Sequence, residues 1–175
     1  MKSKEKLPAV FILSLPIILI IASTMAHQHI SILGSPIYLY AFIYPLTYLF
    51  SCWITKKTDL KSALNAMATT LVLQTVVFVL NWIFFNIMDA YLMIYTFLAF
   101  FLEQLILIFT YDFLVKIKKD TFMSMFLLLL FVSAINNIFF GAFIEGYCLS
   151  LSILPRLAYV VILPAVLARN DKKTK

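Results

Sequence analysis

Two ionisable side chains lie inside long apolar stretches of this sequence. Glu103 is near the middle of the stretch 91–115, and Arg156 is about a third of the way into the stretch 149–168. A charge at membrane depth is costly and by default marks a functional site. At about 1.5 Å rise per residue the depths differ by less than about 10 Å, so an ion pair could form. Alternatively, Arg156 extends outward to lipid headgroups, and Glu103 is protonated or hydrogen-bonded within a helix bundle.

Neutral polar residues accompany these charges at middle or outer depths. Asn136 and Asn137 are adjacent, and because neighbours on a helix project about 100° apart, one interhelical contact does not readily use both. A planar heterocycle needs amides to read its edge and aromatic rings to hold its face. The predicted substrate-binding residues are Arg156, Glu103, Gln104, Asn136, Asn137, Tyr44 and Tyr48. Each neutral residue, together with Thr47, Gln74 and Asn81, could instead only hydrogen-bond one helix to another.

Motifs of enzymes are missing from the sequence. There is no nucleophile elbow, P-loop or metalloprotease helix motif, so we predict no catalytic residues and no cofactor. His27 and His29 offer two imidazoles, but the loops supply no third and fourth ligand, so we predict no metal site. Tyr38 and Tyr40 fit the aromatic belt of a membrane interface.

Composition identifies the solvent that must surround these residues. The 175-residue chain is 63% apolar and only 13% charged, whereas soluble domains are about 25% charged. A soluble fold of this length would leave much apolar surface facing water. The net charge of +6 sits in short clusters between apolar stretches, which indicates membrane topology and not nucleic-acid binding. We therefore predict a single transmembrane domain over residues 1–175.

Six stretches are long enough to cross a bilayer, which needs roughly 17 to 25 apolar residues. They cover about 7–26, 37–54, 62–86, 91–115, 122–144 and 149–168. Apart from Arg156, every Lys and Arg lies in the N-terminus, the second and fourth connections, or the C-terminal tail. The positive-inside rule then predicts an all-α bundle in the cell (inner) membrane with both termini cytoplasmic. The first stretch could alternatively be a signal peptide cleaved after Thr24-Met25-Ala26.

Several short motifs occur in order along the chain: His29–Gly34 followed by Ala41–Leu49, then Phe100–Gln104 leading to Lys116, and Tyr159–Pro164 with Arg156 before it. In these motifs the sequence resembles the VUT family of queuosine-precursor transporters. The chain departs from the family at Cys52 and Leu107, where the family carries Asp. The resemblance implies a six-helix bundle with a cavity for a planar, deazapurine-like solute.

The predicted function is therefore inward transport of a small solute, a queuosine precursor or similar purine-like compound. Glu103 would titrate if transport were coupled to protons. Two alternatives stay open: a substrate-binding subunit of an energy-coupling-factor vitamin transporter, and a membrane scaffold or assembly protein that transports nothing. The expected partners are the lipid bilayer and a small-molecule solute, with no nucleic acid, and a homo-oligomer or coupling subunits are also left open.

Overall fold

The computed structural model describes residues 9–25, 28–32, 35–85, 90–119, 121–140 and 153–172. Within these ranges the chain is helical apart from one short hairpin, which confirms the prediction of an all-α class at that level. The elements are α1 (Ala9–Thr24), β1 (His29–Ile32), β2 (Ser35–Tyr38), α2 (Tyr40–Ile43), α3 (Leu46–Lys57), α4 (Leu60–Phe85), α5 (Ala90–Lys116), α6 (Phe122–Phe140) and α7 (Ile153–Lys172).

The predicted apolar stretches coincide with the helices to within a few residues, except near residue 37. There the expected loop and the start of the stretch 37–54 form an antiparallel hairpin, with His29 opposite Tyr38 and Ile32 opposite Ser35. The start at 37 was therefore wrong, and the helix begins only at Tyr40. Isoleucines in both strands favour extended backbone, which the count of apolar residues could not distinguish from helix. Residues 141–152 at the predicted fifth and sixth stretches lie outside the described ranges.

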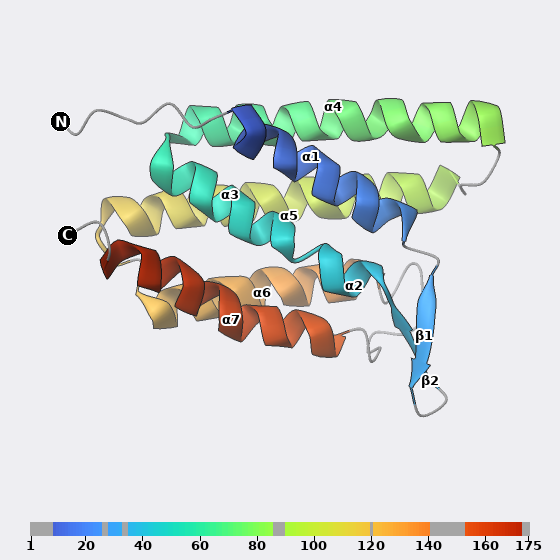
Figure 1. Cartoon of the computed structure of the whole chain (residues 1–175). Coiled ribbons are helices and arrows are strands. Elements are labelled where there is room, and N and C mark those ends of the chain that lie inside the picture. Colours follow the sequence, from blue (N-terminus) through green and yellow to red (C-terminus); the bar gives the residue numbers. More distant parts are fainter. Residues whose placement is uncertain are drawn as a thin grey trace.

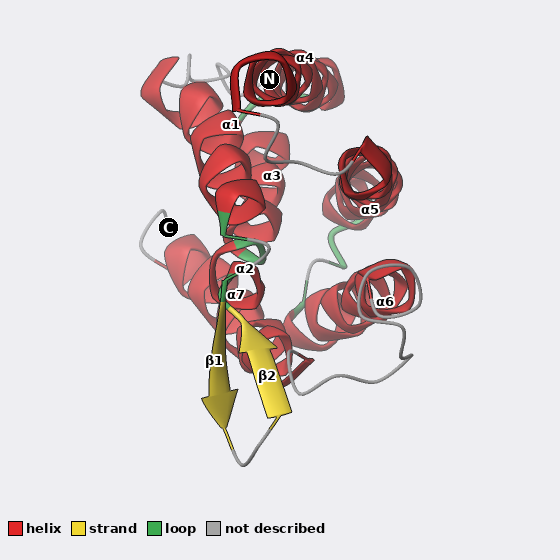
Figure 2. Ribbon diagram, turned by 90° about the vertical axis from the view of Figure 1, so that its right-hand side faces the viewer, coloured by secondary structure: helices red, strands yellow, loops and turns green. Residues whose placement is uncertain are grey.

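Successive helices run in alternating directions, as Figure 1 shows by the colour gradient along each ribbon. α1, α4 and α6 point one way, whereas α2–α3, α5 and α7 point the other way. Each of α4, α5 and α6 packs against the next helix in sequence, and α3 contacts α1, α4, α5 and α7. In the end-on view of Figure 2, α3 accordingly lies between α1 and α5. Residues on α2–α3 are therefore placed to meet most of the bundle.

A break at Tyr44-Pro45 divides the second helical segment into α2 and α3. Pro45 has no amide hydrogen, so the carbonyl of Ala41 loses the donor that an unbroken helix would supply. The backbone passes the break with tighter bonds, from the Thr47 amide to the Tyr44 carbonyl at 2.9 Å and from the Tyr48 amide to the Pro45 carbonyl at 3.1 Å. The Thr47 hydroxyl also donates to the Tyr44 carbonyl at 2.7 Å. The helix is discontinuous here but remains hydrogen-bonded.

α5 is followed by a residue in the left-handed conformation that is not glycine. Lys118 has φ of 54°, the only such non-glycine residue in the described part of the chain. The Lys119 amide bonds to the Leu114 carbonyl at 2.9 Å and the Lys118 amide to the Val115 carbonyl at 3.1 Å. These two bonds are those of a Schellman C-cap, whose left-handed position normally prefers glycine.

In the part of the chain that the structure describes, apolar side chains form the core and also cover much of the outside, and several polar side chains are buried. Large apolar residues are exposed on every long helix, among them Leu13 and Ile17 on α1, Val72, Val76 and Ile83 on α4, Phe109 and Phe113 on α5, Leu127 and Phe131 on α6, and Val161 and Ile162 on α7. The buried polar residues are Thr47, Ser51, Thr55, Thr70, Gln74, Glu103, Gln104, Ser133, Asn136 and Arg156. Exposed apolar surface on this scale marks contact with lipid or with another protein.

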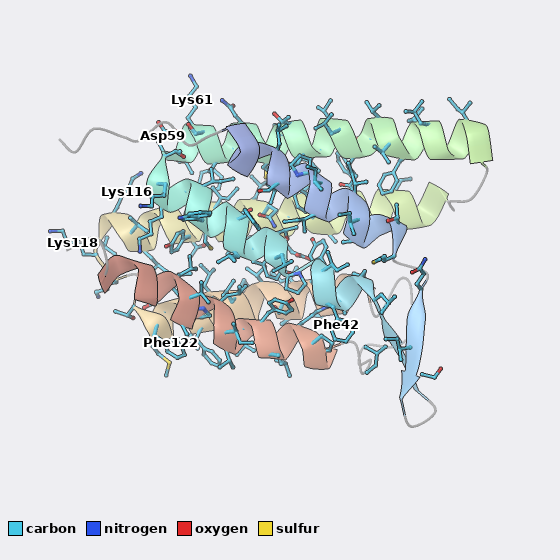
Figure 3. All side chains as sticks on the ribbon, in the orientation of Figure 1. Phe42, Asp59, Lys61, Lys116, Lys118 and Phe122 are labelled. Carbon is cyan, nitrogen blue, oxygen red and sulfur yellow. The ribbon has the colours of Figure 1, made fainter. Side chains whose placement is uncertain are left out.

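Two helical segments, Leu60–Leu80 and Phe97–Lys116, are long and apolar enough to cross a membrane by length and composition. Shorter apolar segments cover Leu13–Ala22, Phe122–Asn136 and Pro155–Leu167 among the described residues. Charged side chains gather at one end of the bundle, where Figure 3 places Asp59, Lys61, Lys116 and Lys118. Asp59 and Lys118 lie in the α3–α4 and α5–α6 connections, and Lys61 and Lys116 lie in the adjoining helix ends. This is the end at which α1 begins and α7 ends.

Candidate functional site

Glu103 on α5 is the centre of a buried polar cluster that joins three segments of the chain. The hydroxyls of Tyr44 and Tyr48 donate to its Oε2 atom at 2.9 and 2.8 Å. The side-chain amide of Asn136 on α6 donates to Oε1. All four side chains are buried. Four of the predicted site residues are thus brought into direct contact.

The spacing of the tyrosines explains how the second helical segment reaches Glu103. Tyr40, Tyr44 and Tyr48 are four residues apart, so they share one face of α2–α3 despite the break. Their rings meet edge to face, with centroids 6.4 Å apart for the first pair and 5.8 Å for the second. Phe100, one turn before Glu103, packs against Tyr44 in the same way at 6.5 Å. Tight aromatic packing therefore fixes the direction of both phenol hydroxyls.

Arg156 on α7 lies at the other end of this row of tyrosines. Its guanidinium carbon is 4.9 Å from the centroid of the Tyr40 ring, a cation–π contact, and the side chain is only 1% exposed. The suggested ion pair with Glu103 is not formed, because Glu103 bonds to the tyrosines and Asn136. Outward extension of the Arg156 side chain is also wrong, because the side chain is buried, and Tyr40 is buried beside it. α7 and the hairpin pack against α2 and cover this region.

Gln104 belongs to a second group of hydrogen bonds between α3 and α5. The Ser51 hydroxyl donates to its Oε1 atom, and its Nε2 atom donates to the Thr47 hydroxyl at 3.3 Å. Thr47, Ser51 and Thr55 are again four residues apart and form a polar stripe beside the tyrosines. Sequence reasoning missed Ser51, although this spacing was visible. Gln104 acts here as an interhelical link, separate from the bonds of Glu103.

Two oxygen atoms on α6, beside the side chains that surround Glu103, make no hydrogen bond of normal geometry. They are Oδ1 of Asn136 and Oγ of Ser133, both buried and one turn apart on the helix. Ser133 was also missed, because a single serine in an apolar helix usually bonds only to its own backbone. The side chain of Asn137 and that of Asn81 lie outside the described residues, and Gln74 is buried on α4.

The chemistry available to this cluster is that of one carboxylate among neutral groups. Among the described residues Glu103 makes no ion pair, and its three donors are two phenols and one amide. Nor do three or more His, Cys, Asp or Glu side chains of the described residues come together as metal ligands. His29 lies in β1, and His27 is outside the described ranges. The cluster can therefore accept hydrogen bonds or a positive charge, and nothing in it resembles a nucleophile with an activating base.

Comparisons with known protein families, with curated proteins and with solved structures gave no match for this chain. The likeness to the VUT family therefore rests on the sequence motifs alone. The class that the fold defines is an all-α helical bundle whose polar side chains gather in its interior.

Proposed function

We propose that this chain is a multi-pass membrane protein that takes up a small planar solute. The first support is the exposure of large apolar residues on all the long helices, while ten polar or charged side chains of the described residues, named above, are buried. In water such a surface would drive aggregation, whereas hydrocarbon solvates it without cost. The two longest apolar helices would cross the bilayer, and the shorter ones would accompany them.

We further propose six spans, with both termini in the cytoplasm. α1, α2–α3, α4, α5, α6 and α7 alternate in direction, as a chain crossing the bilayer repeatedly must do. The lysines in and beside the α3–α4 and α5–α6 connections lie at one end, which fits the positive-inside rule with that end in the cytoplasm.

The observation that carries the transport proposal is the meeting of the broken helix with the Glu103 cluster. Transporters commonly place substrate and ion sites beside discontinuous helices, where polar backbone and side chains meet at membrane depth. Here Tyr44 at the break, Tyr48 one turn further along in α3, and Asn136 on α6 all donate hydrogen bonds to Glu103. A purely structural link does not need three helical segments to converge on a charged group, since neutral pairs suffice.

The solute class follows from the groups present and from the family resemblance. A carboxylate and an amide can read donor and acceptor positions on a heterocycle, and Arg156 with Tyr40 adds a cationic, aromatic neighbour. A deazapurine or purine-like compound, such as a queuosine precursor, offers matching edges. Tyr44 and Tyr48 direct their hydroxyls to Glu103, so in this structure they support the carboxylate.

The test is thermal unfolding of the purified protein in detergent with a panel of deazapurines, purines and vitamins. A ligand at about 100 times its Kd adds about 2.7 kcal/mol, which for a chain of this size raises Tm by roughly 5 to 10 °C. We expect a shift with deazapurines that Glu103→Gln and Asn136→Ala remove. Thr70→Ala is the matched control, because Thr70 is equally buried on α4 and its hydroxyl bonds only to its own helix, at Ala66.

Uptake of the stabilising compound into proteoliposomes containing this chain alone then separates a transporter from a binding subunit. Binding without uptake would indicate that coupling subunits are required. If no compound shifts Tm in protein that is shown to be folded, the proposed solute site is refuted.

A further inference from the structure

Two buried side-chain oxygens in the Glu103 cluster are not well hydrogen-bonded. Oδ1 of Asn136 and Oγ of Ser133 make no hydrogen bond of normal geometry, although Ser133 lies beside the Tyr48 hydroxyl and both residues are at most 3% exposed. An unsatisfied buried polar atom costs about 1–3 kcal/mol, so such atoms call for an explanation. Both are on α6 one turn apart, and Asn136 is turned toward Glu103 by its amide hydrogen bond. The unpartnered atoms therefore belong to the carboxylate's surroundings.

Glu103 itself has no compensating positive charge among the described residues. Its three bonds come from neutral donors, and Arg156 lies over Tyr40 and forms no ion pair with it. A buried carboxylate is strongly favoured by a cation at contact distance. One carboxylate matches a single positive charge, whereas Ca²⁺ sites usually combine several carboxylate and carbonyl oxygens.

The helix break leaves a backbone carbonyl without its helical donor, one turn before Tyr44, whose hydroxyl bonds to Glu103. Pro45 removes the helical donor of the Ala41 carbonyl, and Ala41 is buried. Carbonyls freed in discontinuous membrane helices are recurrent ligands of Na⁺ and sites of proton coupling. Tyr44 at the break also presents its hydroxyl oxygen at Glu103.

We propose that Glu103, Asn136 and Ser133, with the hydroxyls of Tyr44 and Tyr48, form a binding site for Na⁺. This deepens the proposed function, on which it rests, by assigning to the site the ion that drives solute uptake. A proton on Glu103 would need one acceptor and would leave the Ser133 oxygen without a partner, whereas Na⁺ uses several neutral oxygens at once. Only the histidines His27 and His29 suggested a metal site in the sequence. The proposed Na⁺ ligands are instead carboxylate, amide and hydroxyl oxygens.

The experiment measures Tm of the purified protein without solute in NaCl, KCl or choline chloride at equal ionic strength. With a Kd on the order of 10 mM, 100 mM Na⁺ should raise Tm by roughly 3 to 6 °C over choline. Ser133→Ala should remove most of this shift, and Glu103→Gln should abolish it. Thr70→Ala, a buried hydroxyl on α4 away from the cluster, should retain it.

Equal Tm in the three salts would overturn the proposal, as would a Na⁺ shift that survives in both Ser133→Ala and Glu103→Gln. A stabilisation that follows pH without distinguishing Na⁺ from choline would assign the proton, and not Na⁺, to Glu103. The two proposals fail separately: a solute shift without a Na⁺ shift refutes only the ion site, and a Na⁺ shift without any solute shift refutes only the solute transporter.

Discussion

Replacing Glu103 by leucine should destabilise the fold, whereas replacing it by glutamine should leave stability nearly unchanged. Glutamine keeps the shape and one acceptor oxygen for the two tyrosine hydroxyls. Its amide nitrogen would face Asn136, whose side chain can rotate to present Oδ1, the atom that otherwise has no partner. We therefore expect Glu103→Gln to change the free energy of unfolding by less than about 1 kcal/mol.

Leucine offers no acceptor, so the donors of Tyr44, Tyr48 and Asn136 lose their partner in a buried position. Each orphaned donor costs about 1–3 kcal/mol, and one tyrosine hydroxyl can recover a bond from the other. With two donors left unsatisfied, Glu103→Leu should destabilise the protein by about 2–6 kcal/mol. For a chain of 175 residues this corresponds to a fall in Tm of roughly 8 to 16 °C at the middle of that range.

The assay is thermal unfolding of both variants and the parent protein in one detergent, in choline chloride so that Na⁺ does not contribute. Soluble fraction after fixed heating gives a second measure that does not need reversible unfolding. The reasoning is refuted if the two variants have the same Tm, because the hydrogen bonds of Glu103 would then contribute nothing measurable to the fold. A large loss in Glu103→Gln would instead show that the charge itself is needed.

Three further outcomes are expected. Lys118→Gly should stabilise the protein by about 0.5–1 kcal/mol in thermal unfolding, because glycine adopts the left-handed C-cap without strain, whereas Lys119→Gly should not stabilise it. Pro45→Ala should lower the affinity for Na⁺ and solute at least about tenfold in titrations followed by Tm, with the fold retained, because a continuous helix consumes the freed carbonyl. Ser51→Ala should cost about 1 kcal/mol of stability with ligand shifts unchanged, and loss of those shifts would show that the α3–α5 link also shapes the site.

The sequence predicted helix positions well because apolar length is a strong signal. The ends of α4 and α5 lie within a few residues of the expected stretches. The hairpin before Tyr40 was missed, since isoleucines and tyrosine extend the apolar stretch in either conformation. The missing amide hydrogen of Pro45 was enough to predict the break. In the sequence analysis Pro45 counted only as part of the motif Ala41–Leu49.

Which polar residues would be buried together was predicted better than the contacts they make. The depth of a residue in a helix follows from counting residues from the helix end. On that basis Glu103 and Asn136 could meet, and the structure shows that they do. The rotation of each helix about its axis was not accessible, since lipid-facing and interior positions are both apolar. For that reason Arg156 was assigned to Glu103 or to headgroups, whereas it lies over Tyr40. The tyrosines and the threonine–serine residues of α2–α3 recur every four residues. This spacing was the sign in the sequence of which face of that helix turns toward the interior.

Hydrogen bonds that stabilise a membrane bundle and groups that bind a ligand use the same side chains here, so loss of function alone cannot assign a role. Glu103→Leu would abolish binding either way, because it removes both the charge and the bonds to three neighbours. Glu103→Gln removes the charge and keeps an acceptor in place. A protein that is stable with glutamine but no longer responds to Na⁺ or solute would therefore separate the two roles, and a stable variant that still responds would leave Glu103 as a structural link only.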